Sequence, residues 1–286
     1  MIKNIIKIIK SNIIYRKIKF LRQMIKKRIP LKKLQFQMHI VDHCNLNCKG
    51  CGHFSPIAQT KYLDIEKFEK DMKQLADITN KNIARIDLLG GEPLLHPKII
   101  EICNITRRYT NGTIRIFTNG ILLSKQPKEF WESCYKNNIS IVISYYPINI
   151  NYDKVKKIAN TYQVELIYNY KGPSERPWFK PTIDFEGKQN KNKSFSRCSD
   201  ANDCITFEDG KIATCGRPFH IKHFNAFFNK NIQIHNEDCY DIYKIKSHKE
   251  LMRLLAKPIP FCRYCNRDAT IITNWETSKR SINEWM

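Results

Sequence analysis

The sequence lacks any uninterrupted apolar run that approaches the roughly 18 residues of a membrane-spanning helix. Its first residues, MIKNIIKIIKSNII, place a lysine at every third or fourth position. They therefore lack the continuous apolar stretch and the small-residue cleavage site of a signal peptide. These absences argue against a transmembrane or secreted chain, and we expect a cytoplasmic protein.

Acidic residues are missing from the beginning of the chain. Residues 1–33 hold twelve Lys or Arg and no acid, and the first acid is Asp42. This segment supplies about half of the net charge of +22. Isoleucines recur at helical spacing in residues 1–29, which predicts a basic amphipathic helix. Such a helix either contacts the inner face of an anionic membrane peripherally or packs on its own domain with solvated lysines.

The chain holds eleven cysteines, an odd number that fits a fully paired disulfide framework badly. In a reducing compartment thiols stay free, bind metal or do chemistry. Three of them, Cys44, Cys48 and Cys51, crowd one loop at C-x3-C-x2-C spacing. A structural zinc site would need a fourth ligand. Three thiolates, in contrast, can hold three irons of a [4Fe–4S] cluster and leave the fourth iron open to a small chelating molecule.

From residue 35 the sequence alternates strand-like and helix-like segments. Strands are predicted at 35–41, 84–93 with a terminal glycine turn, 113–120, 139–147 and 163–170, and helices at 64–79, 97–109, 127–138 and 153–162. This alternation predicts an α/β fold whose parallel sheet curls into a barrel or part of one. The cysteine loop, GGEP and TNG all follow strands, at the ends where function gathers in such folds.

The cysteine loop after the first strand and GGEP after the second together resemble the radical S-adenosylmethionine (SAM) superfamily over roughly residues 35–170. The resemblance implies a partial (β/α)6 barrel in which Cys44, Cys48 and Cys51 ligate a [4Fe–4S] cluster. SAM chelates the open iron through its amino and carboxylate groups. An electron from a flavodoxin- or ferredoxin-type donor then cleaves SAM to a 5′-deoxyadenosyl radical.

The same resemblance assigns further cofactor-binding residues. Their positions are Gly90, Gly91, Glu92 and Pro93, which match the motif that holds the SAM amino group, and Asn119 and Ser144, at strand ends that often contact the SAM ribose or carboxylate. A plain turn at Asn119 and a plain strand residue at Ser144 are the alternatives. The family usually places an aromatic residue before the third cysteine. Here that residue is Gly50, so His53 or Phe54 would have to meet the adenine.

Six more cysteines lie beyond a boundary that we place around residues 180–195, where the alternation stops. A hairpin predicted over 205–214, with its turn at Asp209-Gly210, would bring Cys198 and Cys215 to one end. The CRYC segment at 262–265 can complete a four-thiolate site there. Four thiolates bind either zinc or an iron–sulfur cluster, and spacing alone does not separate these.

The pattern C-x11-G-x4-C followed by C-x2-C resembles the SPASM/twitch extensions of radical SAM enzymes, in the shorter twitch form. The resemblance implies a second, auxiliary [4Fe–4S] cluster on Cys198, Cys215, Cys262 and Cys265. A role for Cys204 stays open. The remaining cysteines, Cys103, Cys134 and Cys239, are expected to be small buried residues. For Cys239, a role as a substrate-side thiol is the alternative. The expected domains are 1–33, 34–190 and 191–286.

The predicted function is a radical SAM oxidoreductase or epimerase that acts on a sugar, cyclitol or glycan precursor. Its layout resembles the inosamine dehydrogenases of aminoglycoside pathways. A peptide or protein maturase is the alternative, and we favour a small molecule because no peptide-binding segment of suitable size precedes the core. An RNA-modifying enzyme is the third possibility. Nucleic acid is disfavoured as a partner because only the basic surplus supports it and no RNA-binding motif is present.

Overall fold

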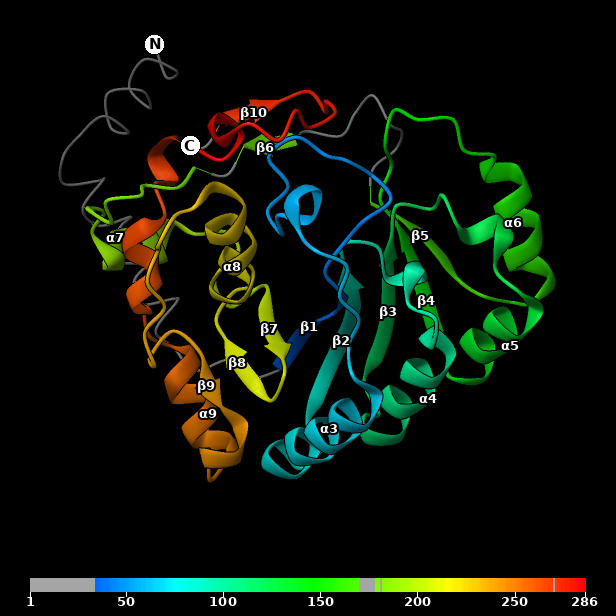
Figure 1. Ribbon diagram of the computed structural model, residues 1–286. Helices are drawn as coiled ribbons and strands as arrows, with labels where there is room; N and C mark the ends of the chain where they lie inside the picture. Colours follow the sequence, from blue (N-terminus) through cyan, green and yellow to red (C-terminus); the bar gives the residue numbers. More distant parts are fainter. Residues whose placement is uncertain (1–33, 170–177, 181, 270) are drawn as a thin grey trace, which may run out of the picture.

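The computed structural model describes residues 34–169, 178–180, 182–269 and 271–286 (Figure 1). In these parts of the chain, no helix combines the length and apolar character needed to cross a membrane. The expected basic helix over residues 1–29, its membrane contact and the expected domain 1–33 lie outside the described residues, so they stay predictions.

An eight-stranded sheet in the order β5-β4-β3-β2-β1-β7-β8-β9 organises the structure (Figure 1). Its first five strands run parallel, and four helices connect them along the chain. These strands are β1 (Leu34–Val41), β2 (Ile83–Gly90), β3 (Thr113–Thr118), β4 (Ile139–Ile143) and β5 (Leu166–Tyr168). The helices are α3 (Ile65–Thr79), α4 (Ile99–Tyr109), α5 (Lys128–Lys136) and α6 (Tyr152–Thr161). The predicted α/β fold with a parallel sheet is confirmed.

The helix α3 illustrates why these segments fold as they do. The carboxylate of Asp64 caps its first turn by accepting a hydrogen bond from the Lys67 N–H at 2.8 Å. Asn80 ends it in the left-handed conformation, with φ of 51°. Between these caps, Phe68 and Met72 recur at helical spacing and are buried in the core. The sequence pattern therefore defines both the length of the helix and its buried face.

The sixth parallel strand of the sheet lies at a different position from the one expected in a (β/α)6 barrel. Within the described residues no strand continues the sheet beyond β5. Instead, β7 (Ile205–Glu208) pairs in parallel with β1 at the opposite side, where Phe36 faces Ile205. The strand β6 (Trp178–Lys180) pairs antiparallel with β10 (Ile271–Thr273) in a separate sheet. The buried strand β1 thus gains a second neighbour from a distant segment rather than presenting an open edge.

The predicted hairpin over 205–214 is confirmed. The strand β8 (Lys211–Ala213) pairs antiparallel with β7, and β9 (Tyr240–Asp241) pairs with β8. The two turn residues, Asp209 and Gly210, have φ of 51° and 74°. Positive φ at both positions is what a two-residue type I′ turn requires.

The C-terminal residues have a hydrophobic core of their own, yet they share the main sheet. Phe195, Phe224, Phe261 and Trp285 pack in this second core. Phe54, from the cysteine loop, joins them. The helices of this part are α7 (Lys191–Arg197), α8 (Arg217–Phe228) and α9 (His248–Leu255). Short 3-10 helices lie at η1 (Ser55–Ile57), η2 (Pro93–Leu95), η3 (Leu123–Lys125), η5 (Ile242–Lys244), η6 (Pro260–Tyr264), η7 (Arg267–Ala269) and η8 (Ile282–Glu284).

We predict that Ile116→Ala destabilises the protein by about 2–5 kcal/mol, because it opens a cavity in a packed sheet. Ile116 is fully buried at the centre of β3, between β2 and β4. Ile234→Ala is the matched control, since Ile234 is 42% exposed and should lose less than about 0.5 kcal/mol. Urea unfolding of both variants measures the difference. Equal losses would mean that the β3 assignment to the core is wrong.

Candidate functional site

The loop that carries the first three cysteines begins directly after β1. Within it, the Cys51 N–H donates to the Cys48 carbonyl at 3.3 Å, and the Phe54 N–H donates to the Cys51 carbonyl at 3.0 Å. Gly50 lies between these cysteines with φ of 62°, a conformation that favours glycine. The backbone therefore explains why glycine, and not an aromatic residue, precedes the third cysteine.

Phe54 is not available to meet an adenine ring. It is 2% exposed, and its ring packs against Phe224 and Trp285 at centroid distances of 5.7 and 5.9 Å. The expectation for Phe54 is therefore wrong, because its side chain belongs to the C-terminal core. His53, the other candidate, lines the cavity described below.

The C-terminal residues 276–285 hold the cysteine loop from its other side. The indole N–H of Trp285 donates to the Cys51 carbonyl at 2.8 Å. The Lys49 N–H donates to the Glu276 carbonyl at 2.9 Å, and the side chains of these two residues form an ion pair at 2.8 Å. No sequence signal pointed to this contact, because it joins segments more than 220 residues apart. The loop is thus held on one side by β1, which it follows directly, and on the other side by residues 276–285.

The two glycines of GGEP let the end of β2 approach the end of β1 closely. The Gly91 N–H donates to the Val41 carbonyl at 2.7 Å, and the Glu92 N–H donates to the His43 carbonyl at 3.1 Å. A Cβ atom on Gly91 would lie 2.0 Å from the His43 carbonyl oxygen, and one on Gly90 would lie 2.3 Å from that of Val41. Any side chain at these positions would push the cysteine loop away from the sheet.

Glu92 has a different partner from the one expected. Its side chain is fully buried, and its carboxylate accepts hydrogen bonds from Leu94 N at 3.1 Å, Thr118 Oγ1 at 2.7 Å and Asn119 N at 2.9 Å. Burial raises the pKa of this carboxyl to about 7, against the effect of these hydrogen bonds. Neither Glu92 nor Pro93 lines the cavity. The Glu92 carboxylate therefore joins the end of β2 to the end of β3 rather than facing a ligand.

Asn119 and Ser144 do face the cavity. The Asn119 side-chain amide donates to Asn45 Oδ1 at 2.8 Å and lies 3.7 Å from the Cys44 sulfur. The Ser144 N–H donates to the Thr118 carbonyl at 2.9 Å, which keeps its hydroxyl at the end of β4. Both residues, predicted from their positions at strand ends, lie where the topology of a parallel sheet brings such ends together.

One cavity of about 710 Å³ is lined by all three cysteines of the first loop and by Cys215 of the second group. Residues at the ends of the parallel strands line one part of it: Cys44, Cys48, Cys51, His53, Gly90, Gly91, Asn119 and Ser144. Residues of the C-terminal region line the other: Asp200, Cys204, Cys215, Arg217 and Arg267. The sequence signals that were found separately therefore belong to one site.

The four cysteines predicted for the second group also converge. Cys198 caps the end of α7, Cys215 follows β8, and Cys262 and Cys265 lie in and directly after η6. Burial, followed by the proximity of the other three thiols, raises the pKa of Cys215 well above its ordinary value. The guanidinium of Arg217 lies 3.6 Å from the Cys265 sulfur. A thiolate at this position would therefore have a cationic partner.

The remaining cysteines separate into three environments. Cys204 faces the cavity, and its thiol pKa is raised to about 12 by burial, Asp200, Asp203 and Cys198, in that order. It therefore lies beside the second group without being one of the predicted four. Cys103 and Cys134 are buried in the main core, as predicted. Cys239 lies apart, near Asp238, and does not line the cavity.

The thiols are not arranged as a closed zinc site. A tetrahedral zinc with Zn–S bonds of about 2.3 Å needs sulfur atoms about 3.8 Å apart. Among the described residues, no three cysteine sulfurs all lie within 4.8 Å of one another. A cubane cluster binds each cysteine to a different iron, so it requires wider separations. None of the seven predicted ligands forms a disulfide, and metal binding would deprotonate their thiols despite their burial.

Sequence reasoning missed three charged residues of the cavity. Asp200 accepts a hydrogen bond from Arg267 at 3.4 Å, and both lie on the cavity wall with Arg217. The only local signal was the position of Arg217, two residues after a predicted ligand, at the start of α8. Arg267 and Asp200 are brought together across 67 residues by the tertiary fold alone.

Residues 38–169 match the family model described as Radical SAM superfamily. The matched segment begins in β1, includes Cys44, Cys48, Cys51 and the GGEP turn, and ends just after β5. It therefore coincides with the parallel part of the sheet and with the strand ends that line the cavity.

Curated relatives resemble a shorter part of the chain. A GTP 3′,8-cyclase of Chlorobaculum tepidum is 38% identical over 89 residues, which cover 30% of this chain and 26% of that protein. A GTP 3′,8-cyclase of Clostridium perfringens is 33% identical over 110 residues, which cover 37% of this chain and 33% of that protein. The chain thus spans between a quarter and a third of the length of these relatives.

A solved structure of BtrN in complex with AdoMet and 2-DOIA resembles the chain over a larger part. The similarity covers 83% of this chain and 94% of that one, with a TM-score of 0.52 and 15% sequence identity. At this identity it shows the fold alone. The family match and the structural likeness therefore agree over residues 38–169, which make up a little less than half of the chain.

Proposed function

We propose that this chain is a radical SAM enzyme that abstracts a hydrogen atom from a small polar substrate. When bound, the cluster and SAM would supply the 5′-deoxyadenosyl radical that performs this abstraction. The observation that carries the proposal is the single cavity in which the three thiols of the first loop meet the glycine edge of β2. Cys44, Cys48 and Cys51 would hold the cluster in this cavity.

The surrounding residues are suited to orient SAM beside such a cluster. Gly90 and Gly91 contribute only backbone atoms to the cavity lining, and their missing Cβ atoms leave room for the backbone of Val41 and His43. The Asn119 amide and the Ser144 hydroxyl add polar groups for the ribose or the carboxylate of SAM. Glu92 acts indirectly, since its hydrogen bonds from Thr118 Oγ1 and the Asn119 N–H hold the turn that carries Asn119.

We propose further that the second cysteine group holds an auxiliary [4Fe–4S] cluster, with Cys198, Cys215, Cys262 and Cys265 as its ligands. Such a cluster would take one electron from the substrate radical, and with loss of a proton the substrate would be oxidised by two electrons overall. Cys215 and the neighbouring Arg217 line the same cavity as the first loop. An electron acceptor at this position would therefore lie across the substrate space from the radical source.

A sugar or cyclitol is the substrate class that we favour. The cavity falls within the range of roughly 300–1,000 Å³ that small-molecule sites occupy. Asp200 and Arg267 place a hydrogen-bond acceptor and several donors on its wall, which suits a polyhydroxylated or amino-substituted ring. A purine nucleotide is the second candidate, because the curated relatives are named GTP 3′,8-cyclase. Peptide and RNA substrates rest on sequence arguments alone.

Deuterium transfer distinguishes these classes. The reconstituted protein is incubated anaerobically with SAM, dithionite and either a ring-deuterated amino-cyclitol or ribose-deuterated GTP. We expect mass spectrometry to find deuterium in 5′-deoxyadenosine from the cyclitol only. Transfer from GTP alone would replace the sugar proposal by the nucleotide one. A flavodoxin- or ferredoxin-type donor, a peripheral membrane contact and a cytoplasmic location stay predictions.

We predict that replacing Cys44, Cys48 and Cys51 together by alanine abolishes reductive SAM cleavage. Two [4Fe–4S] clusters correspond to about eight irons per chain, so this variant should retain about half of the iron. Iron analysis and 5′-deoxyadenosine formation are the measurements. Cys239→Ala is the control, since Cys239 lies outside the cavity and should keep both properties. Zinc in place of iron in the wild-type protein would refute the proposal.

A second prediction concerns Glu92 and pH. The folded carboxyl has a pKa of about 7, above its ordinary value of 4.5. Between these values the unfolded chain loses this proton and the folded one keeps it, so stability falls as pH rises. The shift corresponds to about 3 kcal/mol. Glu92→Gln should remove this dependence.

The measurement is the difference in unfolding free energy between wild type and Glu92→Gln, from urea unfolding in parallel at several pH values from 4.5 to 7.5. We expect the wild type to lose stability relative to the variant as pH rises. Glu129→Gln, at an exposed position of α5, should leave the wild-type dependence unchanged. A difference that stays constant with pH would show that Glu92 is ionised throughout.

A third prediction separates the two cysteine groups. Replacing Cys262 and Cys265 by alanine should remove about half of the iron, leave SAM cleavage intact and abolish formation of the oxidised product. These cysteines pack in the C-terminal core, so circular dichroism must show that the fold is kept. If the folded variant still oxidises its substrate at the wild-type rate, the second group is not the electron acceptor.

A further inference from the structure

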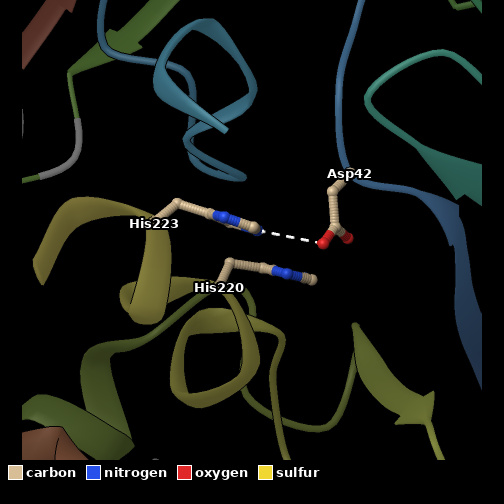
Figure 2. Close-up of side chains that lie close together, drawn as sticks. All are labelled: Asp42, His220 and His223. Carbon is tan, nitrogen blue, oxygen red and sulfur yellow. Dashed lines mark ion pairs between the residues drawn. The ribbon is translucent and has the colours of Figure 1, made fainter. Parts of the chain in front are cut away.

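A third group of ligand-type side chains lies close together outside the cavity lining (Figure 2). It consists of Asp42, His220 and His223, each of which offers one ligand atom within 4.8 Å of the other two. Asp42 follows β1 and precedes the first cysteine of the loop by two residues. The two histidines lie on α8 at positions i and i+3, which places them on one side of that helix. None of the three lines the cavity.

The polar atoms of this group are buried without hydrogen-bond partners. His220 is 1% exposed and Asp42 is 7% exposed. Asp42 Oδ2 and the Nε2 atoms of His220 and His223 make no hydrogen bond. Nε2 of His223 lies 3.3 Å from Asp42 Oδ2, a contact that becomes an ion pair when the ring is protonated (Figure 2). Unsatisfied buried groups of this kind are costly, and a shared ligand would satisfy all three.

The neighbouring charges favour a cation. Lys222 lies beside Asp42 and Glu208, at 3.6 and 3.1 Å from their carboxylate oxygens, and Lys61 lies 3.2 Å from the neighbouring Asp209. The Lys222 side chain is 44% exposed, so it can pair with Glu208 alone and release Asp42. The other Glu208 oxygen lies 3.8 Å from Nδ1 of His220 and has no hydrogen-bond partner. Three carboxylates, of Asp42, Glu208 and Asp209, therefore face two ammonium groups, and Glu208 is a candidate for a fourth ligand.

The ring of His39, on β1, packs against that of His220 with centroids 3.9 Å apart. This contact holds the His220 side chain in place beside Asp42 and His223.

We propose that Asp42, His220 and His223 bind a divalent transition-metal ion, with zinc as the first choice. Two imidazoles and one carboxylate are a donor set that zinc accepts, with water or Glu208 as the fourth ligand. The site is distinct from both cysteine groups. A metal here would tie α8 to the end of β1 and thereby fix the start of the cysteine loop against the C-terminal region.

The test uses protein whose iron–sulfur clusters have been assembled. It is treated with a chelating resin, given a small excess of zinc, desalted and analysed for zinc and iron by mass spectrometry. We expect about one zinc per chain in the wild type and at least tenfold weaker zinc binding in His223→Ala, with iron unchanged. His235→Ala, which removes an exposed histidine, should retain the zinc.

Zinc K-edge X-ray absorption of the wild type gives a second readout that needs no variant. We expect nitrogen and oxygen ligands at about 2.0–2.2 Å and no sulfur at about 2.3 Å. A sulfur shell would place the zinc on cysteines and overturn the proposal. An absence of bound zinc, or equal zinc affinity in wild type and His223→Ala, would overturn it as well. Iron content and SAM cleavage are measured separately, so failure here leaves the proposed function unaffected.

Discussion

The contact between the ends of β1 and β2 is the constraint on which the rest of the site depends. Two backbone N–H groups, of Gly91 and Glu92, donate to carbonyls of Val41 and His43 in the segment that leads into the cysteine loop. This contact exists only because no Cβ atom stands between the two backbones. The Glu92 carboxylate then extends the connection to β3 through Thr118 and Asn119. Hydrogen bonds within the protein itself thus join the ends of β1, β2 and β3.

The C-terminal region completes this arrangement from the opposite side. It adds β7 to the edge of β1, and it holds the cysteine loop through Trp285 and Glu276. Phe54 inserts from the loop into the C-terminal core. The two parts of the chain therefore cannot be treated as independent domains joined by a linker. Changes in the C-terminal region are expected to reach the first cysteine group through these contacts.

The family match and the wall of the cavity involve different parts of the chain. The family match covers the strands and loops that would hold a cluster and SAM. The C-terminal region, which supplies Asp200, Arg217 and Arg267 to the cavity wall, lies outside that match. Any chemistry that this chain shares with those relatives would therefore belong to the first part, whereas the choice of the proposed substrate would depend on the second. The GTP 3′,8-cyclases align with only about a third of this chain. Their names therefore bear on the proposed radical chemistry more than on the choice of substrate.

Local patterns in the sequence were sufficient to predict much of the structure. The alternation of strands and helices, the hairpin turn at Asp209-Gly210 and the burial of Cys103 and Cys134 follow from periodicity and turn chemistry. The predicted ligand sets followed from the spacing of cysteines and from resemblance to known motifs. These features depend on residues that lie close together in the chain, so they can be inferred without knowing the fold.

Only the tertiary structure decided the contacts between distant segments. Strand β7 beside β1, Trp285 on the cysteine loop, and Asp42 beside His220 and His223 each join residues more than 160 positions apart. No periodicity records such a pairing, because it results from the packing of whole elements. The contacts of Glu92 in the structure differ from those predicted from the sequence for the same reason. The sequence alone determined that this residue follows two glycines, whereas the packing of β2 against β3 decided that its carboxylate is buried and faces Thr118.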